Sequence, residues 1–130
     1  MLPGVVGRHA AGASICKILH LKKRFHIGSI VIKHIVMWHL KEFAEGADKA
    51  ANALKMKQLL DACADIVPGI LKFETALAAP GLEATYDVVL YSEFESKAAL
   101  DAYQDHPRHV ALKPFIGAVR QARQCMDYEI

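Results

Sequence analysis

Alternating side chains over residues 31–41 predict the first β-strand of the chain. Successive residues of a strand point to opposite faces, so residues two apart share a face. One face carries Ile32, His34, Val36, Trp38 and Leu40, and the other carries Lys33, Ile35, Met37, His39 and Lys41. Because both sets contain large apolar groups, we expect both faces of this strand to be covered.

A helix is predicted to follow over residues 48–67. Asp48, which comes soon after Gly46, can accept a hydrogen bond from a backbone N–H of the first turn and so cap the helix. Apolar residues then recur at helical spacing, namely Met56, Leu59, Leu60, Cys63 and Val67. Pro68 and Gly69 are expected to end the helix.

The rest of the pattern predicts three more strands and a second helical region. In order, they are the strands 70–78 and 86–94, a helix over 97–105 with Ser96 as its N-cap, a broken helical segment from 107 to about 121, and a strand over 123–129. The turn-rich segment 79–83 joins the first two of these strands, so they are expected to form an antiparallel hairpin.

The resulting order β-α-β-β-α-β predicts an α+β subunit of the ferredoxin-like kind, an antiparallel four-stranded sheet with helices on one face. The candidates for the uncovered face are Ile35, Met37, Val89, Tyr91, Met126 and Tyr128. An apolar patch of this kind is typical of an interface. Two such sheets placed face to face would bury it as an eight-stranded barrel, so we expect a homodimer through the sheet face.

Length and composition fit one domain, since 130 residues with 53% hydrophobic and 23% charged residues suffice for a single core. The pattern begins abruptly at Val31, and residues 31–130 are taken as the domain. Residues 1–30 show neither strand alternation nor an amphipathic stripe, and they contain basic residues without any acid. We interpret them as a basic extension that is either disordered or a start-site artefact, with Val31 as the true initiator.

The charge distribution of the domain does not predict a basic surface of the kind that binds nucleic acid. Five of the 16 Lys and Arg residues lie in 1–30, whereas all 14 acids lie in 31–130, so the domain carries a formal charge of −3 despite the overall +2. No apolar run approaches the ~20 residues of a membrane span. Cys16, Cys63 and Cys125 show no CxxC spacing, which favours free thiols, with the last two buried, and a cytoplasmic location.

Candidate chemistry is concentrated where the helix over 97–105 is expected to stop before Pro107. Tyr103, His106 and His109 are three residues apart, so they can converge at one helix junction. Two imidazoles and a phenol make a candidate proton-transfer site, since histidine titrates near neutrality. The same residues also suit a structural role in the core and the turn. No third ligand lies nearby in sequence, so no metal or other cofactor is expected.

Four short segments carry, in their order and spacing, a resemblance to a known family. They are KHIV at 33–36, IVPG at 66–69, SEFES at 92–96 and AYQDHPRHV at 102–110. With them the chain resembles the stress-responsive A/B barrel proteins, which are dimeric α+β barrels. The resemblance covers nearly all of residues 31–130. It implies a homodimer of ferredoxin-like subunits and leaves the biochemistry open.

Plant polyketide cyclases are a subset of this family, and they close a linear poly-β-ketone by intramolecular aldol condensation. Their Tyr-x-x-His-Pro-x-His motif implies Tyr103 and His109 as a catalytic pair here. His109 would take the acidic proton between two carbonyls, and the Tyr103 hydroxyl would hydrogen-bond the oxygen on which enolate charge develops. The resemblance thus implies a small, largely apolar carbonyl compound held between sheet and helices.

The resemblance implies that His34 contacts that ligand, since it matches a pocket histidine of the first strand, and it places Val88 where the cyclases have another histidine. We also expect Trp38 as an apolar wall and His106 as a further contact. Pro114 and Arg120 are further departures from the cyclases, since the first bends one pocket wall and the second adds a charge to it.

Whether the protein is an enzyme stays open at this point, with two alternatives beside the cyclase-like activity. The first is a dimeric stress or structural protein without catalysis. The second is a cofactor-free monooxygenase or a haem-degrading enzyme, because related barrels use tryptophan, asparagine and histidine in the same cleft. Trp38 suits that chemistry, whereas Asn52 is the single asparagine and lies on the first predicted helix.

Overall fold

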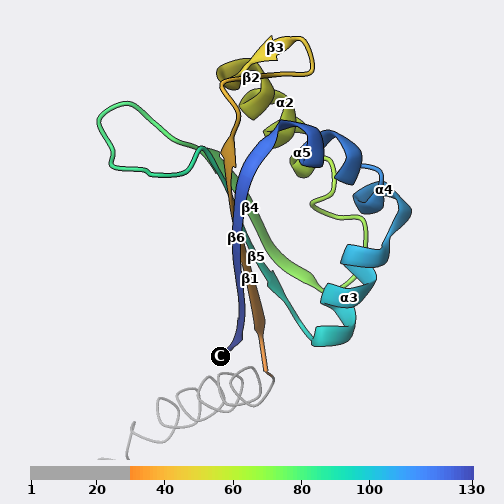
Figure 1. Ribbon diagram of the computed structural model, residues 1–130. Coiled ribbons are helices and arrows are strands. Elements are labelled where there is room, and N and C mark those ends of the chain that lie inside the picture. The colour runs from red at the N-terminus through yellow and green to blue at the C-terminus, as the bar shows by residue number, and fades with distance from the viewer. Residues whose placement is uncertain (1–29) are drawn as a thin grey trace, which may run out of the picture. The chain divides into compact units, whose positions relative to one another are not determined.

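The computed structural model describes residues 30–130, and the interpretation of the N-terminal extension lies outside the described residues. The four long strands form one antiparallel sheet in the order β4-β5-β1-β6. They are β1 (Ile32–Leu40), β4 (Ile70–Leu77), β5 (Val88–Phe94) and β6 (Arg120–Glu129). Figure 1 shows the helices of this unit on one side of the sheet. This arrangement confirms the predicted ferredoxin-like α+β subunit.

The core lies between the sheet and the helices. On β1 the even-numbered residues from Ile32 to Leu40 are all buried, as the predicted alternation requires. On β5, Val88, Leu90, Ser92 and Phe94 are buried in the same way. The helices contribute the other large buried side chains, which include Met56, Leu60, Leu100 and Tyr103.

Helix α2 (Lys49–Asp61) follows a two-stranded hairpin of β2 (Phe43–Ala44) and β3 (Ala47–Asp48). Asp48 caps it as predicted, accepting a hydrogen bond from the Ala51 N–H at 2.9 Å. The prediction that the helix runs to about Val67 is wrong, since regular helical bonding stops at Asp61. Beyond it, Cys63 and Ala64 donate to carbonyls three residues back, which tightens the chain into turns.

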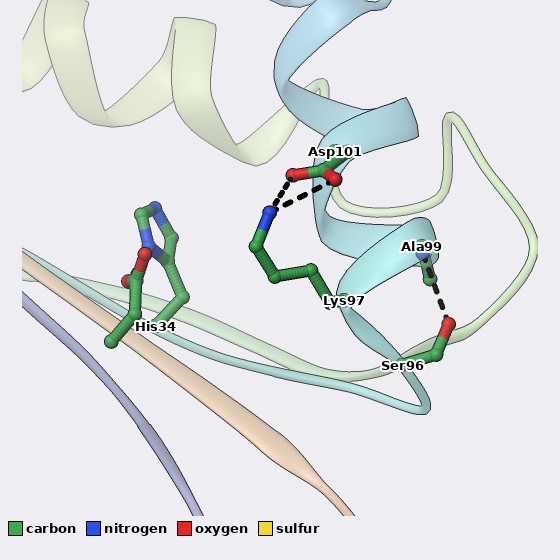
Figure 2. Close-up of polar contacts among 6 residues, drawn as sticks. His34, Ser96, Lys97, Ala99 and Asp101 are labelled. Atoms are coloured by element: carbon green, nitrogen blue, oxygen red, sulfur yellow. Dashed lines mark hydrogen bonds and ion pairs between the residues drawn. The ribbon is translucent and has the colours of Figure 1, made fainter.

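The second helical region consists of α3 (Lys97–Asp105), α4 (Pro107–Val110) and α5 (Lys113–Val119). Ser96 caps α3 through a 3.1 Å hydrogen bond from the Ala99 N–H, and Lys97 pairs with Asp101 one turn further on (Figure 2). His106 caps α4, because its Nδ1 accepts a hydrogen bond from the Arg108 N–H. Pro107 occupies the first turn, where its missing N–H costs nothing.

Strand β6 begins at Arg120, three residues before the predicted start. It forms an edge of the sheet, and its register with β1 shifts between His39 and Leu40. His39 pairs with Ala122 but Leu40 pairs with Arg120, so Gln121 is an extra residue of the kind found in a β-bulge.

Among residues 30–130, no helix lies on the opposite face of the sheet (Figure 1). The cross-strand register places Ile35, Met37, Val89, Tyr91, Met126 and Tyr128 on this face, as predicted. Met37 is 39% exposed and Met126 is 65% exposed, so large apolar groups meet water in the single chain. We call this apolar set the open sheet face.

Both cysteines of the described part, Cys63 and Cys125, are free. Cys63 is buried as predicted, but the prediction that Cys125 is buried is wrong. Cys125 pairs with Val36 and therefore faces the helix side, but it lies on an edge strand and is exposed. No helix of residues 30–130 is long and apolar enough to cross a membrane.

Gly69→Ala is expected to lower the free energy of unfolding by about 3 kcal/mol. Gly69 has φ of +90°, and a Cβ at this position would lie 2.8 Å from the Ala99 Cβ of α3. A left-handed conformation costs a residue with a side chain roughly 1–2 kcal/mol. The steric overlap adds roughly 1–3 kcal/mol, because α3 would have to move from the core. Urea denaturation of both proteins measures the difference.

Gly81→Ala is the matched control, since Gly81 has φ of +85° and no atom within 4 Å of an added Cβ. It should show only the backbone cost of about 1 kcal/mol. Equal destabilisation by the two substitutions would contradict the close approach of Gly69 to α3.

Candidate functional site

A cavity of about 310 Å³ lies between the sheet and the helical region. Its wall combines apolar groups with histidines and cationic groups, and no acidic side chain of residues 30–130 lines it. The lining residues are His34, Val36, Trp38, Leu60, Leu90, Gln104, His109, Leu112, Lys113, Ile116, Gly117, Arg120 and Arg123. Val36, Leu60 and Leu90 are buried and form the floor, whereas Lys113, Arg120 and Arg123 are exposed and form the mouth.

His109 lines the cavity from α4, and its protonation is defined by its hydrogen bond. Its Nδ1 lies 3.0 Å from the backbone carbonyl oxygen of Gln104. A carbonyl only accepts, so Nδ1 carries the proton and Nε2 has the free lone pair of a neutral imidazole. Burial lowers the pKa of His109 below its ordinary value of 6.5, and the positive charges of Lys113 and Arg123 lower it further. His109 is therefore a neutral base at pH 7.

Tyr103 lies beside His109 but not at the cavity. The centroids of the two rings are 4.6 Å apart, so the predicted convergence of these residues is found. The Tyr103 side chain is fully buried, and its hydroxyl has no hydrogen-bond partner among the described residues. Burial raises the pKa of Tyr103 well above its ordinary value of 10. Because Tyr103 is absent from the cavity wall, the structure does not bring its hydroxyl to a ligand there.

His34 lines the cavity from β1, with its side chain rising from the sheet toward the helices (Figure 2). It is 3% exposed, and its Nδ1 is hydrogen-bonded to the Asp127 carboxylate of β6. A carboxylate accepts from Nδ1–H, which leaves Nε2 as the nitrogen free to contact a ligand. Asp127 thus fixes the orientation of the His34 ring.

The other predicted ligand contacts are divided between the cavity and its surroundings. Trp38 lines the cavity and is 5% exposed, while its Nε1–H has no hydrogen-bond partner among the described residues. Val88 pairs with Trp38 across the sheet and is buried, but it does not line the cavity. His106 does not line it either, since its imidazole caps α4.

Lys113 and Arg123 are cavity residues that the sequence reasoning missed, whereas it noted Arg120 as a charge on the wall. The alternation that places Met126 and Tyr128 on the open sheet face places Arg123 on the helix side, so strand periodicity could have indicated it. Lys113, on α5, had no such signal. Gln104 was missed too, although it is adjacent to Tyr103 in the motif that was singled out.

Asn52 lies outside the cavity. Its side-chain amide donates hydrogen bonds to the carbonyls of Ala44 (2.9 Å) and Ala47 (3.3 Å), which ties α2 to the β2–β3 hairpin. A combination of Trp38 and Asn52 around one ligand is therefore not formed. Within residues 30–130, no group of three or more His, Cys, Asp or Glu side chains is placed to hold a metal ion.

Three solved structures share this architecture. A dimeric protein of unknown function with a ferredoxin-like fold from Bacteroides fragilis is 31% identical, with 77% of this chain and 96% of that chain covered and a TM-score of 0.65. A dabb family protein from Mesorhizobium loti is 23% identical (76% and 95% covered, TM-score 0.58). Hydroxynitrile lyase from Passiflora edulis is 17% identical (77% and 93% covered, TM-score 0.60), a likeness of fold alone.

The family model described as stress responsive A/B barrel domain matches residues 32–130, from β1 through the end of β6. No curated protein sequence matches the chain. The family match spans the whole described sheet and all its helices, in agreement with the motifs noted in the sequence. The chain therefore belongs to the stress responsive A/B barrel domain family.

Proposed function

We propose that this domain binds a small, largely apolar carbonyl compound in the cavity and catalyses its enolisation, with His109 as the general base. The observation that carries the proposal is the fixed, neutral imidazole of His109 at the wall of a cavity with an apolar floor. Pockets of this kind, apolar with a few converging polar groups, are the usual sites of small-molecule chemistry.

The reaction starts with a proton transfer. Nε2 of His109 takes a proton from the carbon next to a carbonyl, and the electrons of that C–H bond form the C=C bond of an enolate. Negative charge moves to the carbonyl oxygen, where the positive charges of the nearby Lys113, Arg120 and Arg123 can stabilise it. Return of the proton from His109 to the carbon completes an enolisation cycle.

Cyclisation uses the same enolate. In a compound with several carbonyls, the enolate carbon can attack a second carbonyl of the same molecule and form a C–C bond. The proton held by His109 then neutralises the new alkoxide, so the base is regenerated. The cavity volume of about 310 Å³ suits a compound of small size for either outcome.

Tyr103 has a positioning role in this proposal. Its ring packs against His109 from within the core, and Phe94 and Phe73 pack against Tyr103 with centroid distances of 5.3 and 5.9 Å. This aromatic group, together with the Gln104 carbonyl, holds the His109 ring in one orientation. The hydroxyl of Tyr103 takes no part, because it does not reach the cavity.

A homodimer through the open sheet face completes the proposal. The similar Bacteroides fragilis protein is dimeric, and it is 31% identical over most of its length. The loop after β4 adds to this face, where a hollow of about 510 Å³ is lined by Met37, Val89 and Leu82 among others. A second copy would cover these apolar groups.

The free thiols of Cys63 and Cys125 suit a reducing, cytoplasmic setting.

The experiment that tests the function uses benzoylacetone, a neutral 1,3-diketone with an apolar body. In D₂O, enolisation exchanges the protons between its two carbonyls for deuterium, and NMR follows their loss. We expect the protein to accelerate this exchange above the buffer rate, with saturation as benzoylacetone increases. Exchange at the buffer rate would contradict catalysis and would favour a binding or structural role for the fold.

A further inference from the structure

We propose that the compound held in this cavity carries a carboxylate, which Arg120 and Arg123 of β6 bind at the mouth together with Lys113 of α5. This inference rests on the proposed function, since it specifies the ligand of the same cavity. Both arginines point to the cavity, neither pairs with a carboxylate among residues 30–130, and the floor behind them is apolar.

The bulge in β6 brings both arginines to one face. Arg120 and Arg123 are three residues apart, and in a regular strand such residues point to opposite faces. Here Arg123 pairs with Trp38 and Arg120 pairs with Leu40, and both of these partners face the helices. The extra residue, Gln121, therefore re-aims one arginine so that two guanidinium groups converge on the cavity.

The cations at the mouth have no counter-charge in the described part of the chain. None of the side chains of Lys113, Arg120 and Arg123 lies within 4.0 Å of a carboxylate among residues 30–130, although Lys49, Lys57 and Lys97 do. The cavity wall contains no acid that could neutralise them. Three like charges around one opening favour an anion, and guanidinium groups bind a carboxylate through two parallel hydrogen bonds.

The floor of the cavity defines the rest of the ligand. Val36, Leu60 and Leu90 are buried apolar groups behind the cationic mouth, and Leu112 and Ile116 line the helical side. A monoanion with an apolar body fits this arrangement of a cationic mouth and an apolar floor, with its carboxylate at β6 and its apolar body inside. His109 lies in the same wall, so the chemical class is an apolar keto acid whose ketone is inside the cavity.

Binding of two matched probes tests this inference. 4-Oxo-4-phenylbutanoate and its methyl ester share an apolar ketone body and differ in the negative charge, and isothermal titration calorimetry measures each dissociation constant. We expect the acid to bind roughly 10- to 100-fold more tightly than the ester, the effect of a hydrogen bond to a charged group. Arg123→Gln and Arg120→Gln should each remove most of that difference and leave ester binding unchanged.

Lys97→Gln is the matched control, because it removes one positive charge from an exposed pair on α3 (Figure 2). It should leave binding of both probes unchanged. Equal binding of acid and ester, failure of the acid to bind, or an equal effect of Lys97→Gln and Arg123→Gln would each overturn the inference. Because benzoylacetone is neutral, its exchange reports on the proposed function independently of these outcomes.

Discussion

His109→Ala is expected to lower the protein-catalysed exchange of benzoylacetone by roughly 10²–10⁴-fold, the usual contribution of a general base. The substitution removes the imidazole whose Nε2 would take the proton, while Lys113, Arg123 and the apolar floor stay in place. Binding of the neutral ketone should therefore change little. The measurement is the NMR exchange rate at saturating benzoylacetone, with the buffer rate subtracted.

His106→Asn is the matched control for this loss. His106 belongs to the same turn, but its side chain caps α4 and does not line the cavity, and asparagine is a good capping residue. The exchange rate of this variant should equal that of the unmutated protein. Added imidazole should restore part of the rate in His109→Ala, which a merely structural role of His109 would not produce. Full activity of His109→Ala would assign the proton transfer to another group.

The pH dependence of the exchange rate on the acidic side reports the protonation of the same imidazole. A base must be neutral to act, so the rate falls as pH drops through the pKa of His109. That pKa lies below 6.5, since burial, Lys113, His34 and Arg123 all disfavour the cation and outweigh the Gln104 carbonyl. The midpoint should therefore lie below pH 6.5. Lys113→Gln removes one of the positive charges, so it should raise the pKa of His109 and move the midpoint to higher pH.

The parts of the fold that follow from local periodicity could be predicted from the sequence. The two faces of β1 followed from alternation alone, and the bounds of α3 followed from the Ser96 cap and from Pro107. His34, Trp38 and His109 were placed at one cavity because the resemblance to the family fixed the topology that brings β1 and α4 together. For β1 and α3, the local signal agreed with the global arrangement.

The features that were not predicted correctly depend on contacts that the periodicity of the sequence does not specify. The apolar spacing of Cys63 and Val67 continued beyond Asp61, but the backbone there turns tightly while these side chains still pack on the core. The bulge at Gln121 depends on pairing with β1, so the convergence of Arg120 and Arg123 had no local signal. Tyr103 was expected at the ligand because its motif matches, yet its hydroxyl lies inside the core.

Met37→Asp is expected to dissociate the proposed dimer. Met37 lies on the open sheet face next to Val89, and its side chain would be covered by the second copy. Two-fold symmetry introduces the buried charge twice, and an unpaired buried charge costs several kcal/mol. A loss of about 4 kcal/mol weakens association roughly 10³-fold. Sedimentation velocity over a concentration series measures the shift from dimer to monomer.

Leu54→Asp provides the control, because it adds the same charge to an exposed apolar residue of α2, on the helix side of the sheet. Leu54 is 51% exposed and Met37 is 39% exposed, so the two substitutions differ mainly in which face receives the charge. We expect Leu54→Asp to sediment as a dimer and Met37→Asp as a folded monomer, with unchanged circular dichroism in both. A monomeric unmutated protein, or a Met37→Asp variant that dimerises normally, would show that the open sheet face is not the interface.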